Sequence, residues 1–404
     1  MEIKTISEVY EAVCDKYDIK INPDVLGVLQ KTPATGSLTL KLAGNVRLRR
    51  VQRLSDDDVL VLCKCLQNNQ HVTGLDLRYN NIGDEGAGHL AELLQQQNSA
   101  LRSLDVMFND IKTDGAKVLA SSLQTNSSLL SLRLSGNKLG NRAAMDLVSV
   151  LQVNNTLQEL QLDDCDLATQ SVIALSIALK SNEVLRCVDI SRPLLFSLQE
   201  DWAIHFSEML AVNGSLLELH LGKMEMTDSG MERLTEGLKL NQSLRYLDLR
   251  CNRVTRDGVR HLAEVLKKNS ALEIIDLSAN RIEDEGAAYL SDAIASPGCI
   301  LKELSVISNN IRTDGLLSLV QAMKTNSTLT HIYIWGNHLE EPVCLAFREL
   351  TCSGRLPPEQ TDVSAYEVDG RVFLAQVSNG LRKRWFRCDG RSTSSDTNAP
   401  RPDS

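Results

Sequence analysis

The stretch Leu244–Val254 decides the fold, and it reads Leu-Arg-Tyr-Leu-Asp-Leu-Arg-Cys-Asn-Arg-Val. Leu247 and Leu249 alternate with polar or aromatic residues, which is typical of a strand with one buried face. Asn252 ends the alternation, and an asparagine at that point predicts a side chain that bonds the backbone of a turn. The same arrangement returns at Leu272–Ile282. The chain is therefore expected to contain a repeated strand-and-turn unit.

The turn position recurs along most of the chain at intervals of 28 to 31 residues. Its occupants are Asn80, Asn109, Asn137, Cys165, Pro193, Met224, Asn252, Asn280, Asn309 and Asn337. After each turn comes a segment with helical spacing, such as Asp84–Leu94 or Arg256–Leu266, and an irregular first unit lies at Ser37–Leu48. Neither half of a unit can bury its apolar face alone. Stacking therefore predicts one parallel sheet and one layer of helices, with the sheet concave because helices are wider than strands.

The ends of the chain lack the repeat. We expect residues 1–36 to form a helical N-terminal cap, residues 37–350 the array, and residues 351–388 a C-terminal cap. Within the C-terminal cap, Tyr366–Leu374 predicts a hairpin, because Asp369-Gly370 suits a tight type I′ turn. Residues 389–404 are rich in Ser, Thr, Asp and Pro, and we expect them to be disordered.

The middle units depart from the pattern. Cys165, Pro193 and Met224 stand where other units have Asn, and the interval that contains Phe196 is the longest. None of these three side chains is expected to bond the turn as asparagine does. Two interpretations stay open: neutral drift in an array whose stability is spread over neighbours, or a local hinge.

The repeated unit resembles the leucine-rich repeat, specifically its ribonuclease-inhibitor-like subclass, over roughly Ser37–Leu350. The motif that carries the resemblance is L-x-x-L-x-L-x-x-N followed by a full helix. This resemblance implies a horseshoe solenoid of about eleven units. It also implies a non-enzymatic scaffold that binds a protein on its concave face. Some relatives regulate a GTPase by contact, so a contact regulator of a GTPase or another enzyme is the alternative.

Composition limits the class of partner and the compartment. The 404 residues carry a formal net charge of −9, which disfavours nucleic acid as the main partner and permits a basic protein. We see no signal peptide and no apolar run long enough for a membrane span. The ten cysteines are scattered, and free thiols are expected. We therefore expect a monomer in the cytoplasm or nucleus (the nucleolus included) that is neither secreted nor bound to a membrane.

Two sets of residues on the outward side of the strands are candidate sites. The first is an acidic row that would attract a basic partner, or would simply be a solvated face. Its members are Asp76, Asp105, Glu159, Asp163, Asp189, Glu218, Asp248 and Asp276. The second is an apolar cluster of Ile307, Tyr333 and Trp335, with Tyr246 further back, unless the C-terminal segment covers it. Our hypothesis is that Tyr333 and Trp335 anchor the partner, while acidic residues around Asp248 and Asp276 orient it. Arg250 is a further candidate for partner binding.

No catalytic group, cofactor site or metal site is expected. Carboxylates on an open sheet should be solvated, with ordinary pKa values. Cys63 and Cys65 point in different directions on a helix, His220 and His331 are four units apart, and Cys187 is an ordinary thiol on a strand. The basic cluster Leu381–Arg387 is either an import signal, a contact for an acidic partner, or a segment that is solvated or neutralises the acidic array.

Overall fold

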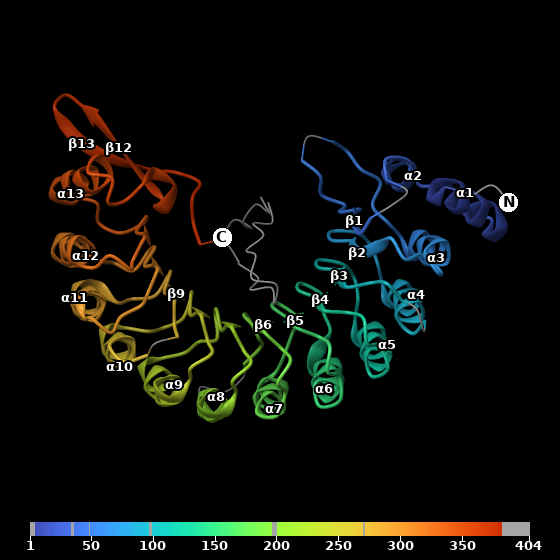
Figure 1. Ribbon diagram of the computed structural model, residues 1–404, viewed down its shortest axis with the longest axis horizontal. Coiled ribbons are helices and arrows are strands. Elements are labelled where there is room, and N and C mark those ends of the chain that lie inside the picture. Colours follow the sequence, from blue (N-terminus) through green and yellow to red (C-terminus); the bar gives the residue numbers. More distant parts are fainter. Residues whose placement is uncertain are drawn as a thin grey trace.

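The computed structural model describes residues 5–33, 36–47, 49–96, 99–195, 200–269 and 271–381. Within these ranges eleven strands form one parallel sheet, in which each strand pairs with its neighbours in sequence. Figure 1 shows the sheet on the inside of an arc and the helices on the outside. The predicted horseshoe solenoid is confirmed. The predicted disordered tail and most of the basic cluster, from 382 onward, lie outside the described residues.

The strands are short and evenly spaced along the chain. They are β1 (Leu38–Lys41), β2 (Val72–Asp76), β3 (Ser103–Asp105), β4 (Ser131–Arg133), β5 (Glu159–Gln161), β6 (Cys187–Asp189), β7 (Glu218–His220), β8 (Tyr246–Asp248), β9 (Ile274–Asp276), β10 (Glu303–Ser305) and β11 (His331–Tyr333). The leucine in the middle of each regular strand faces the helices, and Leu104, Leu132 and Leu219 are fully buried there. The alternate side chains therefore lie on the concave side.

The helices follow the strands in turn. Two precede the sheet, α1 (Ile6–Tyr17) and α2 (Pro23–Gln30). The others are α3 (Asp56–Cys65), α4 (Asp84–Leu94), α5 (Thr113–Leu123), α6 (Gly140–Val150), α7 (Thr169–Leu179), α8 (Asp201–Val212), α9 (Asp228–Leu240), α10 (Arg256–Leu266), α11 (Glu283–Ala295), α12 (Thr313–Thr325) and α13 (Glu341–Cys352). In several helices, the backbone N–H groups of the first turn donate to an aspartate at the start of the preceding helix. The Asp228 carboxylate, for example, accepts from the N–H groups of Thr255 (2.7 Å) and Gly258 (3.0 Å) at the start of α10.

The turn asparagines form the expected ladder. The Asn252 amide donates to the carbonyls of Leu221 and Leu249, each at 2.9 Å, and its oxygen accepts from the backbone N–H of Met224 and Met226. Asn252 thus supports both its own turn and the preceding turn, where Met224 occupies the asparagine position. Each buried asparagine satisfies backbone N–H and C=O groups that have no backbone partner within the turns.

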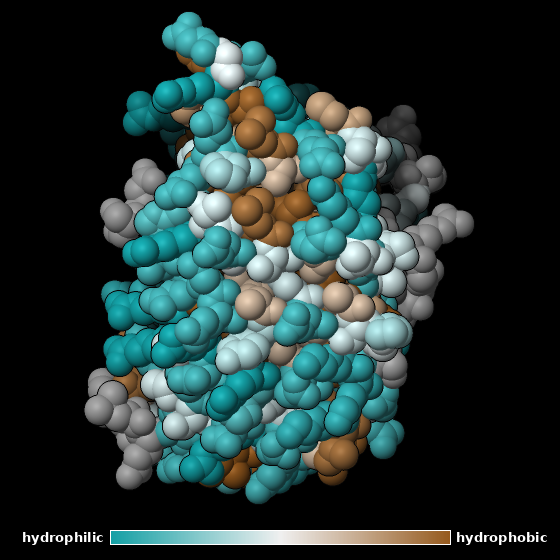
Figure 2. Space-filling view, turned by 90° about the vertical axis from the view of Figure 1, so that its left-hand side faces the viewer, coloured by the Kyte–Doolittle hydropathy of each residue, from teal (hydrophilic) through white to brown (hydrophobic). Residues whose placement is uncertain are grey.

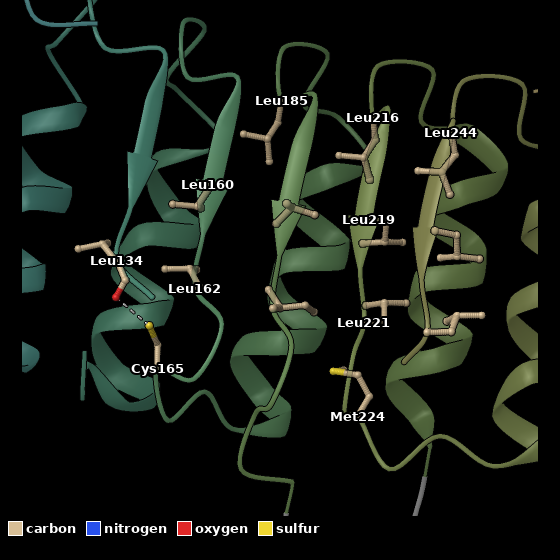
Figure 3. Packing of buried hydrophobic residues seen from close by; sticks show 14 of the residues in the cluster. Leu134, Leu160, Leu162, Cys165, Leu185, Leu216, Leu219, Leu221, Met224 and Leu244 are labelled. Atoms are coloured by element: carbon tan, nitrogen blue, oxygen red, sulfur yellow. Dashed lines mark hydrogen bonds between the residues drawn. The ribbon is translucent and has the colours of Figure 1, made fainter. Parts of the chain in front are cut away.

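The ladder is only partly interrupted in the middle units. The Cys165 thiol donates to the carbonyl of Leu134 at 3.2 Å, as the dashed line in Figure 3 shows. The expectation that Cys165 cannot bond the turn is therefore wrong, because its thiol acts as a donor. A thiol cannot also accept the backbone N–H in the way an asparagine oxygen does, so the Leu139 N–H turns to the carbonyl of Asn137 instead.

A second asparagine ladder, which the sequence analysis did not identify, lies where each helix leads into the next strand. Asn213 illustrates it: its amide donates to the carbonyls of Leu179 and Asn182, and its oxygen accepts from the N–H groups of Ser215 and Leu216. Equivalent bonds are made by Asn126, Asn154, Asn182, Asn241, Asn269 and Asn326. This ladder continues through the units in which the first one is weakened.

The C-terminal residues close the last unit. Thr361 bridges Ile332 of β11, and the Asp362 carboxylate accepts from the N–H groups of Ile334 (2.8 Å) and Trp335 (3.0 Å). The following hairpin, β12 (Val363–Val368) and β13 (Arg371–Gln376), packs on α13. Its turn residues Asp369 and Gly370 have φ of 50° and 77°, as a type I′ turn requires. The exposed edge of β11 is thus covered.

Candidate interaction site on the concave face

Ion pairs link the polar side chains on the first strands of the concave face. Arg78 forms a two-pronged pair with Asp76, at 2.8 and 2.9 Å, and lies 3.6 Å from Asp105. Arg133 lies 3.5 Å from Asp105 and 2.6 Å from Glu159. Carboxylates and guanidinium groups therefore alternate over four neighbouring strands, where the sequence analysis had expected a solvated acidic row.

Burial changes the acidity of these groups. Asp105 is 7% exposed, and this burial raises its pKa to about 6, although Arg133 and Arg78 act in the opposite direction. Asp276 is 6% exposed, and burial together with the neighbouring Asp248 raises its pKa to about 6. The expectation of ordinary pKa values on an open, solvated sheet is wrong. Parallel strands lie only about 4.8 Å apart, so polar side chains on neighbouring strands cover each other.

A buried histidine occupies the centre of the concave face. Nδ1 of His220 lies 3.2 Å from Asp248, and Nε2 lies 3.3 Å from Glu218. Burial lowers the pKa of His220, but the hydrogen bonds to the two carboxylates raise it more, to about 9. Arg250 pairs with Asp248 at 3.3 Å and, with His220, holds the pKa of that carboxyl below its usual range in spite of burial.

The proposed aromatic anchors differ in exposure. Tyr246 is 2% exposed and its ring meets the His220 ring edge-on at 4.9 Å, while Tyr333 is 3% exposed. The expectation that these two rings are open to solvent is therefore wrong. Ile307 and Trp335 are half-buried. Among the polar residues of the hypothesis, Asp248 and Asp276 are buried, whereas Asp76 and Arg250 are partly exposed.

A pair of aromatic residues that the sequence analysis missed lies at the N-terminal end of the face. Tyr79 and Phe108 follow β2 and β3, and their rings stack with centroids 4.7 Å apart and planes inclined by 9°. Phe108 is 37% exposed. A Cβ at Gly136 would come within 2.4 Å of the Phe108 ring, so the glycine leaves room for the stack. The signal in the sequence is that two successive units carry an aromatic residue directly before the turn asparagine.

The backbone at these positions is left-handed. The residue before the turn position has positive φ in every regular unit, and Tyr79 and Phe108 have 58° and 52°. Bulky side chains rarely adopt this conformation, whereas glycine, asparagine and aspartate adopt it readily. Two successive aromatic residues here therefore run against the local backbone preference.

A second exposed aromatic pair lies away from the concave face. Tyr366 and Phe373 of the hairpin stack at 5.7 Å and are 49% and 41% exposed. Together with Val368 and with Leu345 of α13, they are exposed apolar residues at the C-terminal end. Figure 2 shows apolar residues gathered in the upper half of this end of the molecule. This hairpin pair provides a matched comparison for the pair on the concave side.

Comparison with known proteins agrees with this architecture. The Leucine Rich repeat family pattern matches residues 68–91, 97–120, 125–148, 153–176, 240–263 and 268–291. The chain is 51% identical over 383 residues to leucine-rich repeat-containing protein 34 of Homo sapiens, covering 93% of this chain and 82% of that protein. The chain belongs to the leucine-rich repeat family. The proteins of the same name from Mus musculus (93% and 92% covered) and Rattus norvegicus (95% and 94%) are 44% and 46% identical.

Two solved structures align over most of this chain at low sequence identity. A chain of the yeast Rad7 and Elc1 complex is 16% identical with a TM-score of 0.49, covering 83% of this chain and 84% of that one. An internalin from Listeria monocytogenes is also 16% identical, with a TM-score of 0.45 and coverage of 89% and 95%. Leucine-rich repeat proteins are generally non-enzymatic scaffolds for protein interaction. Within the described ranges, no helix has the length and apolar character that crossing a membrane requires.

Proposed function

We propose that this chain is a non-enzymatic scaffold whose concave face binds a basic protein. The observation that carries the proposal is the exposed Phe108 stacked on the half-buried Tyr79, beside the Arg78–Asp105 pair. Aromatic residues on a rigid surface lose little conformational entropy on binding, and they dominate the energetics of many interfaces. Their left-handed backbone is unfavourable for bulky side chains, which supports a role for the two rings beyond packing.

The charge on the face favours a basic partner. Carboxylates outnumber arginines on the concave face. The arginines described above are Arg78, Arg133 and Arg250. Such a surplus speeds the encounter with a basic surface and disfavours an acidic one. In this proposal the half-buried Ile307 and Trp335 form a second contact area on the same face as the buried Tyr246, Tyr333, Asp248 and Asp276.

In this proposal the redox state of the cysteines indicates the compartment. None of the nine described cysteines forms a disulfide, and Cys251 and Cys352 are exposed. Free thiols suit a reducing compartment, so we place the binding in the cytoplasm or nucleus.

The test compares proximity labelling in cells by three forms of the full chain. One is unchanged, one carries Tyr79→Asn and Phe108→Asn, and one carries Tyr366→Ala and Phe373→Ala. Asparagine tolerates positive φ, so the first variant removes aromatic surface without straining the turn. We expect a set of labelled proteins, enriched in basic ones, to be lost only from the Asn variant. Equal loss from both variants, or from neither, overturns the proposal.

The alternative, a contact regulator of a GTPase or another enzyme, is tested with the proteins that the labelling recovers. Nucleotide turnover by any recovered GTPase is measured with and without the full chain. A scaffold leaves the turnover rate unchanged, whereas a regulator changes it.

A further inference from the structure

Three side chains with metal-binding atoms converge on the centre of the concave face. Cys187 lies on β6, directly opposite Glu218 of β7 in the sheet register, and His220 lies two residues further along β7 on the same side. The Cys187 sulfur is 3.8 Å from Oε2 of Glu218, which is 3.3 Å from Nε2 of His220. All three donor atoms lie within 4.8 Å of one another, and the side chains are buried.

These separations suit a single ion. Zinc binds sulfur at about 2.3 Å and nitrogen or oxygen at about 2.0–2.2 Å, so two ligands of a tetrahedral site lie roughly 3.3–3.6 Å apart. The Cys187–Glu218 and Glu218–His220 separations are within a few tenths of an ångström of that range. The third pair, Cys187 and His220, lies within 4.8 Å, so binding an ion requires these side chains to approach each other by up to about 1 Å.

A fourth residue holds the histidine in the orientation that metal binding needs. Nδ1 of His220 lies 3.2 Å from the Asp248 carboxylate, which also receives the backbone N–H of Arg250 at 3.0 Å. A metal-binding histidine commonly donates its other N–H to a carboxylate, which fixes the tautomer and strengthens the ligand. Here Nδ1–H is donated to Asp248, so Nε2 is the atom that binds the ion once its own proton is lost.

We propose that Cys187, Glu218 and His220 bind one divalent zinc-type ion, with Asp248 as the positioning residue. Sulfur and imidazole ligands favour zinc over magnesium or calcium. On binding, the ion replaces the Cys187 thiol proton and the proton shared between Nε2 and Glu218, and both protons go to solvent. Three protein ligands leave a fourth position for water or another ligand.

A second carboxylate–histidine pair gives an internal comparison. Glu303 and His331 lie opposite each other on β10 and β11, 4.0 Å apart, but among the described residues the cluster that includes a thiol lies only on β6 and β7. A polar network that merely satisfies a buried histidine needs no sulfur beside it. Replacing the Cys187 thiol therefore distinguishes a metal site from a network that only hydrogen-bonds the histidine.

The experiment titrates Co²⁺, as a spectroscopic substitute for zinc, into full chain treated with a chelator and then freed of it. We expect one ion per chain, the visible bands of tetrahedral cobalt, and a near-ultraviolet thiolate-to-cobalt band. Zn²⁺ should displace the cobalt. Cys187→Ser should abolish the near-ultraviolet band and weaken binding at least tenfold, and Asp248→Asn should weaken it about 10–100-fold. The control Cys251→Ser, which removes an exposed thiol, should change neither the near-ultraviolet band nor the affinity for cobalt.

Circular dichroism establishes that each variant is folded. If Cys187→Ser does not fold, Glu218→Gln decides, because it removes a ligand and retains the side-chain volume. Absence of saturable binding by the unchanged chain overturns the proposal. So does a thiolate band that survives Cys187→Ser, or unchanged affinity in Glu218→Gln.

Discussion

The ring of Phe108 lies parallel to that of Tyr79, 4.7 Å away, although both residues have a left-handed backbone. Two effects on stability oppose each other there. Replacing both residues with asparagine relieves backbone strain of roughly 1 kcal/mol at each position and removes a stack worth about 0.5–1.5 kcal/mol. We expect the free energy of unfolding to fall by no more than about 1 kcal/mol, measured by urea denaturation. A much larger loss would mean that the pair is a structural element of the array.

The Asn252 side chain is expected to be among the most important polar groups for stability. It makes buried hydrogen bonds to four backbone groups in two adjacent turns. Asn252→Ala should lower the free energy of unfolding by about 2–4 kcal/mol, because it leaves buried backbone groups without partners. The control Asn81→Ala, at an exposed position beside a turn, should change it by about 0.5 kcal/mol or less. Similar effects of the two variants would contradict this role.

At Cys165 the reverse substitution is possible, because an asparagine can be introduced at the turn position. Its thiol donates to Leu134 but leaves the Leu139 N–H to the Asn137 carbonyl. Cys165→Asn supplies the missing acceptor and should raise the free energy of unfolding by about 1 kcal/mol. Thermal denaturation under reducing conditions measures it. A destabilised variant would show that the local packing is adapted to sulfur.

The second asparagine ladder argues against a hinge in the middle of the array. Asn154, Asn182, Asn213 and Asn241 bond successive units across the region in which the first ladder is weakened. We expect amide hydrogen exchange to show similar protection in β5 to β8. Protection about tenfold lower in β6 and β7 than in β4 and β9 would support the hinge.

Asp105 predicts a pH dependence. Its pKa in the folded chain is about 6, above its ordinary value, so its ionisation disfavours the fold. The favourable contribution is present below about pH 4 and is lost as the pH rises through 6, since the unfolded chain releases this proton first. Relative to Asp105→Asn, the unchanged chain should lose about 2–3 kcal/mol between pH 4 and 7. Paired urea titrations measure the difference, and a difference independent of pH would contradict the shift.

The sequence was sufficient to predict the solenoid because each unit repeats the same local information. Leu247 and Leu249 define the buried side of a strand, and Asn252 defines the turn. Stacking of identical units then leaves little freedom in the topology. The hairpin was likewise predictable, because Asp369-Gly370 has a strong local preference.

The candidate sites were less predictable, because they depend on contacts between units. Alternation shows that Tyr246 and His220 face the concave side, but not that their rings meet and are buried. The convergence of Cys187 with Glu218 depends on the sheet register, which places residues 31 positions apart side by side. The Tyr79–Phe108 pair was missed because only the positions expected to alternate outward along each strand were considered, whereas the pair lies directly before the turn asparagine.

The most direct measurement for the concave-face proposal is site-specific photocrosslinking of the full chain in cells. A photoreactive phenylalanine analogue is placed at position 108 in one preparation and at position 373 in another. Both positions carry an exposed phenylalanine that stacks on a tyrosine, but only the first borders the concave face. We predict a discrete crosslinked protein, with a basic surface, from position 108 and not from position 373. No crosslink at 108, or the same crosslinks from both positions, would contradict binding at this face.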